Sequence, residues 1–232
     1  MSRHVSIAFA AAAIVLALAG CMTAGIIASL VPPGTANVLL GNMEKVSEVN
    51  RKRVGELART GRWDDLAKLA EENTARERSN ADWWLVLGYA RSQSGDHRAA
   101  ANAYREAVRV EPDNESAWNL LAQSHRALGD SERAVVVLNN ALLALREAPV
   151  TVYLLGESYS DLGRYADARA AYEKSLSIEP QFAAAWLGLT RTYERLGLTD
   201  EAREARAKLQ KLDPKLAKRL DAALPTAGAA AR

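Results

Sequence analysis

Residues 82–112 decide the fold and read DWWLVLGYARSQSGDHRAAANAYREAVRVEP. The apolar residues Trp84, Leu87 and Ala90 follow the spacing of one helix face. Arg91, which also falls on this face, is a departure from the apolar pattern. Gly95 is expected to end this first helix, where a positive φ is needed. Asp96 can then cap a second helix. The stretch therefore predicts two helices joined by a tight turn.

The second helix of this hairpin has its own apolar face. Ala100, Tyr104, Ala107 and Val108 fall on one side of it. The small alanines let the two helices approach closely, and the aromatic ring of Tyr104 fills the gap that they leave. Pro112 is expected to stop the second helix and to allow a new one to begin.

The same pattern recurs along the chain with a period of 34 residues. Five glycines keep this spacing: Gly61, Gly95, Gly129, Gly163 and Gly197. Prolines lie 17 residues after three of these glycines, at Pro112, Pro180 and Pro214. Tryptophans lie 11 residues before three of them, at Trp84, Trp118 and Trp186. Arg146 and Val152 stand at the interrupted positions. Because one hairpin cannot bury its own apolar face, successive hairpins are expected to stack.

This pattern resembles the tetratricopeptide repeat, whose signature is W-x2-L-G-x2-Y followed by alanine, phenylalanine, alanine and proline at fixed offsets. Two stretches match it well, at Trp84, Leu87, Gly88, Ala100, Tyr104, Ala107 and Pro112, and at Leu155, Gly156, Tyr159, Ala168, Tyr172 and Pro180. The resemblance implies an all-α fold, a right-handed superhelical solenoid of stacked helix-turn-helix hairpins.

The repeat register also predicts boundaries. The solenoid is expected to span 36–224, with matching repeats at 81–114, 115–148, 149–182 and 183–216. A degenerate repeat at 47–80 keeps Gly61 but has Asn50 and Arg78 at the tryptophan and proline positions. Terminal repeats are commonly atypical. Residues 213–224 read as a capping helix and 225–232 as a flexible tail.

The N-terminus has the features of a secretory leader. Arg3 precedes an apolar run of 14 residues, 5–18, which is shorter than the roughly 20 residues of a membrane span. The run ends at Leu18-Ala19-Gly20-Cys21, and Cys21 is the only cysteine of the chain. These four residues resemble the lipobox of bacterial lipoproteins.

The lipobox resemblance implies that residues 1–20 are a signal peptide and that Cys21 carries a covalent lipid. It also implies a lipid anchor in the bacterial cell envelope. Met22 follows the cysteine in place of the aspartate that commonly retains lipoproteins at the inner membrane. We therefore expect the outer membrane, with the chain facing the periplasm.

Two alternatives remain open in this region. The leader could stay uncleaved as an anchor, because apolar residues resume after Cys21. In the linker of residues 21–35, the segment 25–31 could enter the membrane surface beside the lipid or dock on the solenoid.

Composition and residue types argue against other functions. A formal net charge of +2 provides no field that would attract nucleic acid, so no nucleic-acid partner is expected. His97 is expected to be solvated and His125 to pack where the repeat commonly has tyrosine; neither has a partner at metal-ligand spacing. The sequence predicts no catalytic residue, no metal site and no cofactor beyond the lipid on Cys21, so the chain is not expected to be an enzyme.

The tetratricopeptide resemblance implies a concave groove lined by the first helix of each repeat, where a protein or peptide partner binds. Its inward positions correspond to Leu85, Tyr89, Gln93, Asn119, Gln123, Arg126, Tyr153, Glu157, Asp161, Leu187, Arg191 and Arg195. Tyr89 and Tyr153 are the predicted anchors for a partner.

We therefore expect a membrane-anchored scaffold for assembly of an envelope machine, with a pilus or secretion system as the first hypothesis. An adaptor for peptidoglycan enzymes, a role in outer-membrane protein assembly and a self-associating structural lipoprotein are the alternatives. The oligomeric state is left open.

Overall fold

The computed structural model describes residue 43 and residues 45–223, with side chains described up to residue 220. The predicted signal peptide 1–20, Cys21, the linker 21–35 and the tail 225–232 lie outside this range, and so does the predicted start of the solenoid at residue 36. The chain divides after Arg62 into two compact units, which are described separately. The predicted degenerate repeat 47–80 is split between them.

In the first unit, helix α3 spans Glu48–Arg59. Ser47 caps its start by accepting a hydrogen bond from the Asn50 backbone N–H at 3.4 Å. Val54 and Leu57, one turn apart, are the buried residues of this helix. The chain then turns at Gly61, which has a φ of 69°.

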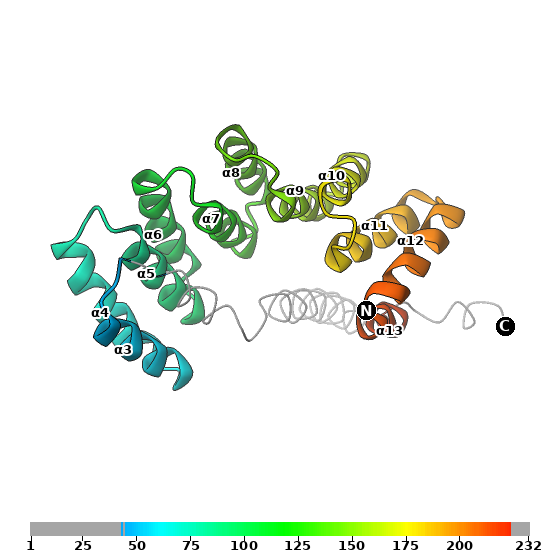
Figure 1. Cartoon of the computed structure of the whole chain (residues 1–232). Helices are drawn as coiled ribbons and strands as arrows, with labels where there is room; N and C mark the ends of the chain where they lie inside the picture. Colours follow the sequence, from blue (N-terminus) through cyan, green and yellow to red (C-terminus); the bar gives the residue numbers. More distant parts are fainter. Residues whose placement is uncertain (1–42, 44, 224–232) are drawn as a thin grey trace, which may run out of the picture. The chain divides into compact units, whose positions relative to one another are not determined.

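The second unit contains helices in consecutive pairs (Figure 1). They are α4 (Trp63–Arg76), α5 (Ala81–Gln93), α6 (His97–Val110), α7 (Glu115–Ala127), α8 (Ser131–Ala144), α9 (Pro149–Asp161), α10 (Tyr165–Ile178), α11 (Ala183–Leu196), α12 (Thr199–Leu212) and α13 (Pro214–Ala223). Each helix packs on the next one along the chain from α4 to α13, and the first helices also pack on one another, α7 on α9 and α9 on α11. The expected all-α fold of stacked helical hairpins is confirmed.

The glycine of each hairpin turn has the positive φ that the sequence predicts, and the turn at Gly95 also has the predicted side-chain cap. Gly95 has a φ of 82°, and the Asp96 N–H donates to the Arg91 carbonyl at 2.9 Å, which closes the end of α5. The Asp96 side chain accepts from the Ala99 N–H at 2.9 Å and caps α6. An L-residue at position 95 would be strained, because its side chain disfavours this φ.

The predicted apolar face of α5 is buried only in part, at Ala90, which is 0% exposed. Trp84 and Leu87 remain partly exposed, whereas Trp83 is 1% exposed and Val86 2%. The physical reason is that α5 packs on both α4 and α6, so that more than one side of the helix is covered. A single apolar stripe cannot represent such a helix.

Trp84 instead donates a hydrogen bond whose equivalent is found in two other repeats. Its indole N–H donates to the carbonyl of Arg78, six residues earlier, at 3.0 Å. Trp118 donates in the same way to Pro112 at 2.8 Å, and Trp186 to Pro180 at 2.9 Å. Each of these tryptophans therefore ties its helix to the loop that precedes it.

Close contacts between helices surround the aromatic residues of the second helices. Tyr104 and Tyr172 are each 1% exposed. A Cβ atom added at Gly88 would lie 2.5 Å from the Tyr104 ring. The Tyr172 ring has a glycine on both sides. A Cβ atom added at Gly156 would lie 2.7 Å from the ring, and one added at Gly188 would lie 2.5 Å from it. Glycine is required here for its size, because any larger residue would overlap the ring.

Candidate partner-binding site

The twelve residues predicted to line the groove lie three to a helix on α5, α7, α9 and α11. Within each helix they are spaced three or four residues apart, so each set shares one face. Because α7 packs on α9 and α9 on α11, the sets on these three helices adjoin one another. We call these twelve residues the inner face.

Four of the twelve form the buried floor of the inner face. Leu85, Asn119, Tyr153 and Leu187 are each 6–7% exposed. The Tyr153 ring packs against Tyr172, with centroids 5.9 Å apart, and against Phe182 at 5.1 Å. We therefore withdraw the prediction that Tyr153 anchors a partner, because its ring is already used between helices.

Asn119 connects two repeats through polar contacts. The Thr151 hydroxyl lies 2.9 Å from the Asn119 Oδ1 atom and 3.0 Å from the Glu115 Oε1 atom. Thr151 is fully buried, and these acceptors satisfy its hydroxyl. Asn119 is therefore a structural residue between α7 and α9.

An ion-pair network occupies the middle of the inner face. The Arg126 Nε atom donates to Asp161 at 2.7 Å and its Nη2 atom to Glu157 at 3.4 Å. Glu157 also accepts from the Tyr172 hydroxyl at 2.6 Å, and Asp161 from the Ser131 hydroxyl at 3.3 Å. Burial alone lowers the pKa of Arg126, but the Asp161 hydrogen bond and the two carboxylate charges leave that pKa raised. The guanidinium is therefore a fixed charge bound within the solenoid.

The remaining residues of the inner face offer surface to a partner. Gln93 and Arg195 are exposed, and Tyr89, Gln123 and Arg191 are partly exposed. The Tyr89 ring meets the edge of Trp63 at 5.7 Å, which holds the ring in place. A stiff aromatic residue, two amides and two arginines can contact both the side chains and the backbone of a peptide.

Sequence reasoning missed the Arg126 network, although a signal for it exists. Arg126 and Asp161 are 35 residues apart, one more than the repeat length. Residues one repeat apart on first helices lie side by side when the hairpins stack. Opposite charges at this separation can therefore indicate an ion pair between neighbouring repeats.

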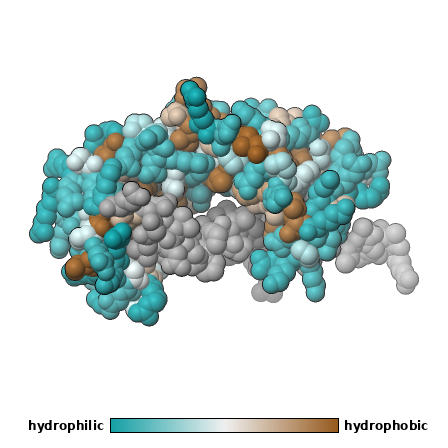
Figure 2. Space-filling model, viewed as in Figure 1, coloured by the Kyte–Doolittle hydropathy of each residue, from teal (hydrophilic) through white to brown (hydrophobic). Residues whose placement is uncertain are grey.

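The surface seen in Figure 2 is mostly hydrophilic, and its apolar residues occur in small groups between hydrophilic ones. The residues of the inner face that are available for contact are likewise mixed in character. A partner on such a surface is recognised by a few aromatic and charged contacts rather than by a broad apolar patch.

The two histidines differ from the expectation in one respect. His125 is 7% exposed, as a packing role predicts, but His97 is partly buried rather than solvated. The Nδ1 atoms of both lack a hydrogen-bond partner. In residues 43 and 45–220, no group of three or more His, Cys, Asp or Glu side chains could hold a metal ion. Helices 48–223 include none that is long and apolar enough to cross a bilayer.

Acid is expected to destabilise the fold through His125. Burial lowers the pKa of His125, so the unfolded chain binds the proton more tightly than the folded chain does. The associated stability is present above the unfolded pKa of about 6.5 and is lost as pH falls toward the folded pKa. Urea denaturation of wild type and His125→Phe should therefore diverge between about pH 7 and pH 5, with the flatter profile in the variant. Parallel profiles would contradict this role of His125.

Two family models match parts of the chain. A family model described as Tetratricopeptide repeat matches residues 160–224. A second model, described as Anaphase-promoting complex, cyclosome, subunit 3, matches residues 93–175.

Two curated proteins are similar over part of their length. The TPR repeat-containing protein MJ0940 of Methanocaldococcus jannaschii is 32% identical over 103 residues, which cover 44% of this chain and 32% of that protein. Tetratricopeptide repeat protein 36 of Mus musculus is 33% identical over 118 residues, covering 48% of this chain and 62% of that one. The chain thus spans less than two thirds of the length of these relatives.

Solved structures with the same fold include MamA, with a TM-score of 0.62 and 24% identity over 71% of this chain and 96% of MamA. YrrB, a TPR protein with an unusual peptide-binding site, has a TM-score of 0.57 and 16% identity over 73% and 88% of the two chains. PilW, a type IV pilus biogenesis factor, has a TM-score of 0.60 and 20% identity over 77% and 89%. At these identities the likeness is one of fold. The stacked hairpins of this chain thus share the fold of these structures, and residues 160–224 match the model described as Tetratricopeptide repeat.

Proposed function

We propose that this chain is a lipid-anchored scaffold that binds a protein partner through its inner face during assembly of an envelope machine. The observation that carries the proposal is the accessible part of the inner face, with Tyr89, Gln123 and Arg191 above a buried floor. The inner face provides contacts for an extended segment or a helix of the partner.

A pilus or secretion system is the machine that we favour. The fold shared with PilW, a type IV pilus biogenesis factor, supports this choice by analogy. The anchoring part of the proposal rests on Cys21 and the three residues before it. Several acyl chains on one cysteine hold a protein at a bilayer firmly, whereas a single chain binds only marginally.

Site-specific photo-crosslinking in cells tests the binding role. A photoreactive residue at Gln123 on the inner face should capture a partner, and the same residue at the exposed Lys174 of α10 should not. Adding Tyr89→Ala should reduce capture by about tenfold, as expected for a stiff aromatic residue that anchors a partner. Tyr165→Ala, which removes a partly exposed tyrosine from α10, is the matched control.

The captured protein decides between the envelope roles. Pilus or secretion components would support the first choice, whereas a peptidoglycan enzyme or an outer-membrane assembly factor would support one of the alternatives. Equal capture from positions 123 and 174 would refute a role for the inner face. The anchor is tested separately by the mass of the mature N-terminus and by membrane fractionation of Cys21→Ser, which should release the protein from the membrane.

A further inference from the structure

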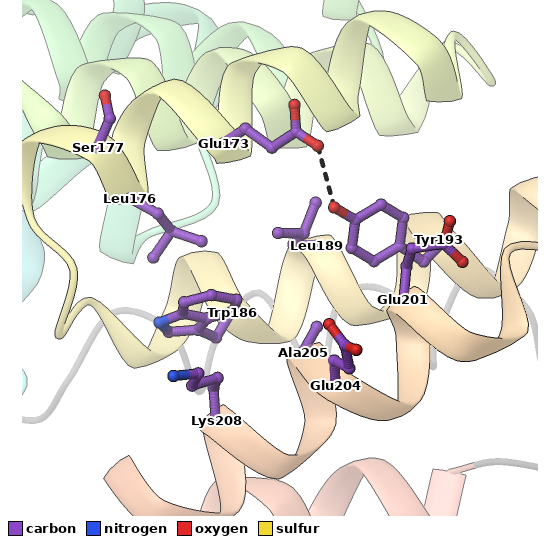
Figure 3. A pocket seen from close by; sticks show the side chains of 10 residues that line it. All are labelled: Glu173, Leu176, Ser177, Trp186, Leu189, Tyr193, Glu201, Glu204, Ala205 and Lys208. Atoms are coloured by element: carbon purple, nitrogen blue, oxygen red, sulfur yellow. Dashed lines mark hydrogen bonds between the residues drawn. The ribbon is translucent and has the colours of Figure 1, made fainter.

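A pocket of about 400 Å³ lies on the second unit between α10, α11 and α12 (Figure 3). This volume falls in the range of about 300–1,000 Å³ that is typical of ligand pockets. Trp186, Leu189 and Tyr193 enter it from α11, so the pocket is lined by a face of this helix. The inner-face residues of α11 lie at 187, 191 and 195, which the helical period of 3.6 residues places on another face. This outer pocket is therefore separate from the inner face.

The wall of the outer pocket is apolar and held in place. Leu176 and Leu189 are 7% and 3% exposed and pack into the fold. Trp186 is fixed by the hydrogen bond from its indole N–H to the Pro180 carbonyl at 2.9 Å. The indole N–H is thereby satisfied, and the ring contributes apolar surface to the pocket (Figure 3).

Carboxylates surround this wall. Glu173 accepts a hydrogen bond from the Tyr193 hydroxyl at 3.0 Å, and burial together with this bond raises the pKa of Tyr193 to about 12. Glu201 and Glu204 project from α12 toward α11 in Figure 3. Neither of these two forms an ion pair within the described part of the chain. Lys208 is the cation among the lining residues and Arg169 pairs with Glu173 at 3.6 Å, so the three carboxylates outnumber the two cations.

The combination of Glu173, Glu201 and Glu204 is specific to the outer pocket and is not a general feature of the repeat. One repeat earlier, the positions of Glu173, Glu201 and Glu204 hold Asn139, Asp167 and Ala170. Two repeats earlier they hold Arg105, Arg133 and Val136. Three repeats earlier they hold Glu71, Ala99 and Asn102, so none of these three earlier sets of positions contains three carboxylates.

We propose that the outer pocket binds a basic side chain, arginine or lysine, from a segment of a protein partner. The methylene stem of such a side chain would lie along Trp186 and Leu189, while its charged end meets Glu201 and Glu204 beside the Tyr193 ring. Apolar walls lower the local dielectric and strengthen this charge pairing. The outer pocket is a second recognition site, distinct from the inner face.

Fluorescence anisotropy with the full chain tests this assignment. The probe is a labelled pentapeptide with arginine at its second and fourth positions and with alanine or leucine elsewhere, compared with the same peptide carrying citrulline for arginine. Citrulline has nearly the same shape but no charge, so its peptide should bind about tenfold more weakly. Glu201→Gln with Glu204→Gln should weaken the arginine peptide by a similar factor while preserving the side-chain volume.

Two control variants locate the binding. Glu194→Gln removes an exposed carboxylate on α11 outside the pocket, and Tyr89→Ala alters the inner face; both should leave binding of the arginine peptide unchanged. Equal binding of the citrulline and arginine peptides would overturn the proposal. It would also be overturned if Tyr89→Ala weakened binding of the arginine peptide while Glu201→Gln with Glu204→Gln did not. A dimer of the full chain that depends on Glu201 and Glu204 would overturn it in favour of a second copy as the occupant.

Discussion

Replacing Tyr172 with alanine is expected to lower the free energy of unfolding by about 3–5 kcal/mol, the usual cost of removing a buried aromatic side chain. The Tyr172 ring is 1% exposed and lies between the backbones of Gly156 and Gly188. Because α9 and α11 approach one another around this ring, the space left by alanine cannot be filled without moving both helices. Urea denaturation followed by circular dichroism measures the change.

Tyr172→Phe is the matched control, because it keeps the ring and removes only the hydroxyl. The lost contacts are the hydrogen bond to Glu157 at 2.6 Å and a longer one with the Ser160 hydroxyl at 3.5 Å. A hydrogen bond to a charged group contributes about 1.5–3 kcal/mol, so phenylalanine should cost less than alanine. If alanine proved no more harmful than phenylalanine, the packing between the two glycines would not be what holds these helices together.

Replacing Arg126 with methionine is expected to be the second most damaging change, at about 2–4 kcal/mol. The Arg126 side chain is 9% exposed and pairs with Glu157 and Asp161, whose side chains are 20% and 39% exposed. Methionine fills much of the same volume but leaves two carboxylates near one another without a cation. The cost is at the lower end for a buried pair, because Asp161 retains contact with water.

A charge-neutral triple variant separates this effect from packing. Arg126→Met combined with Glu157→Gln and Asp161→Asn should recover a large part of the lost stability, since no unpaired charge remains. The exposed pair of Arg203 and Asp200, with side chains 76% and 82% exposed, is the control. Arg203→Met should change stability by less than about 0.5 kcal/mol. No recovery in the triple variant would mean that the shape of the arginine, rather than its charge, is what matters.

The repeat register predicted the hairpins because each of its residues acts locally. Gly95 adopts the positive φ and Asp96 caps the next helix whatever the neighbouring repeats contribute. The choice between Trp83 and Trp84 as the buried residue was not accessible in this way. It depends on α5 having a neighbour on two sides, which is a property of the stack.

The candidate site was predicted less completely than the fold. The register correctly placed the twelve residues on the first helices. It could not show which of their side chains are used in contacts with neighbouring helices. The Tyr153 ring on α9 packs against Tyr172 on α10, and Arg126 on α7 pairs with Asp161 on α9. Such pairings depend on side-chain conformation across repeats, which periodicity does not describe. The outer pocket was missed because its carboxylates follow no repeat pattern.

The tryptophan hydrogen bonds make the links between repeats unequal. Trp84, Trp118 and Trp186 each couple a helix to the preceding loop, but Val152 has no indole N–H to donate at the start of α9. That junction has Arg146 where the loops before α7 and α11 have proline and the loop before α5 has Arg78, and Glu147 adopts a φ of 49°. The start of α9 therefore lacks a link to the preceding loop that the starts of α5, α7 and α11 have. If the second unit is pulled from its ends, we expect extension to begin at this junction, before the junctions that an indole hydrogen bond holds.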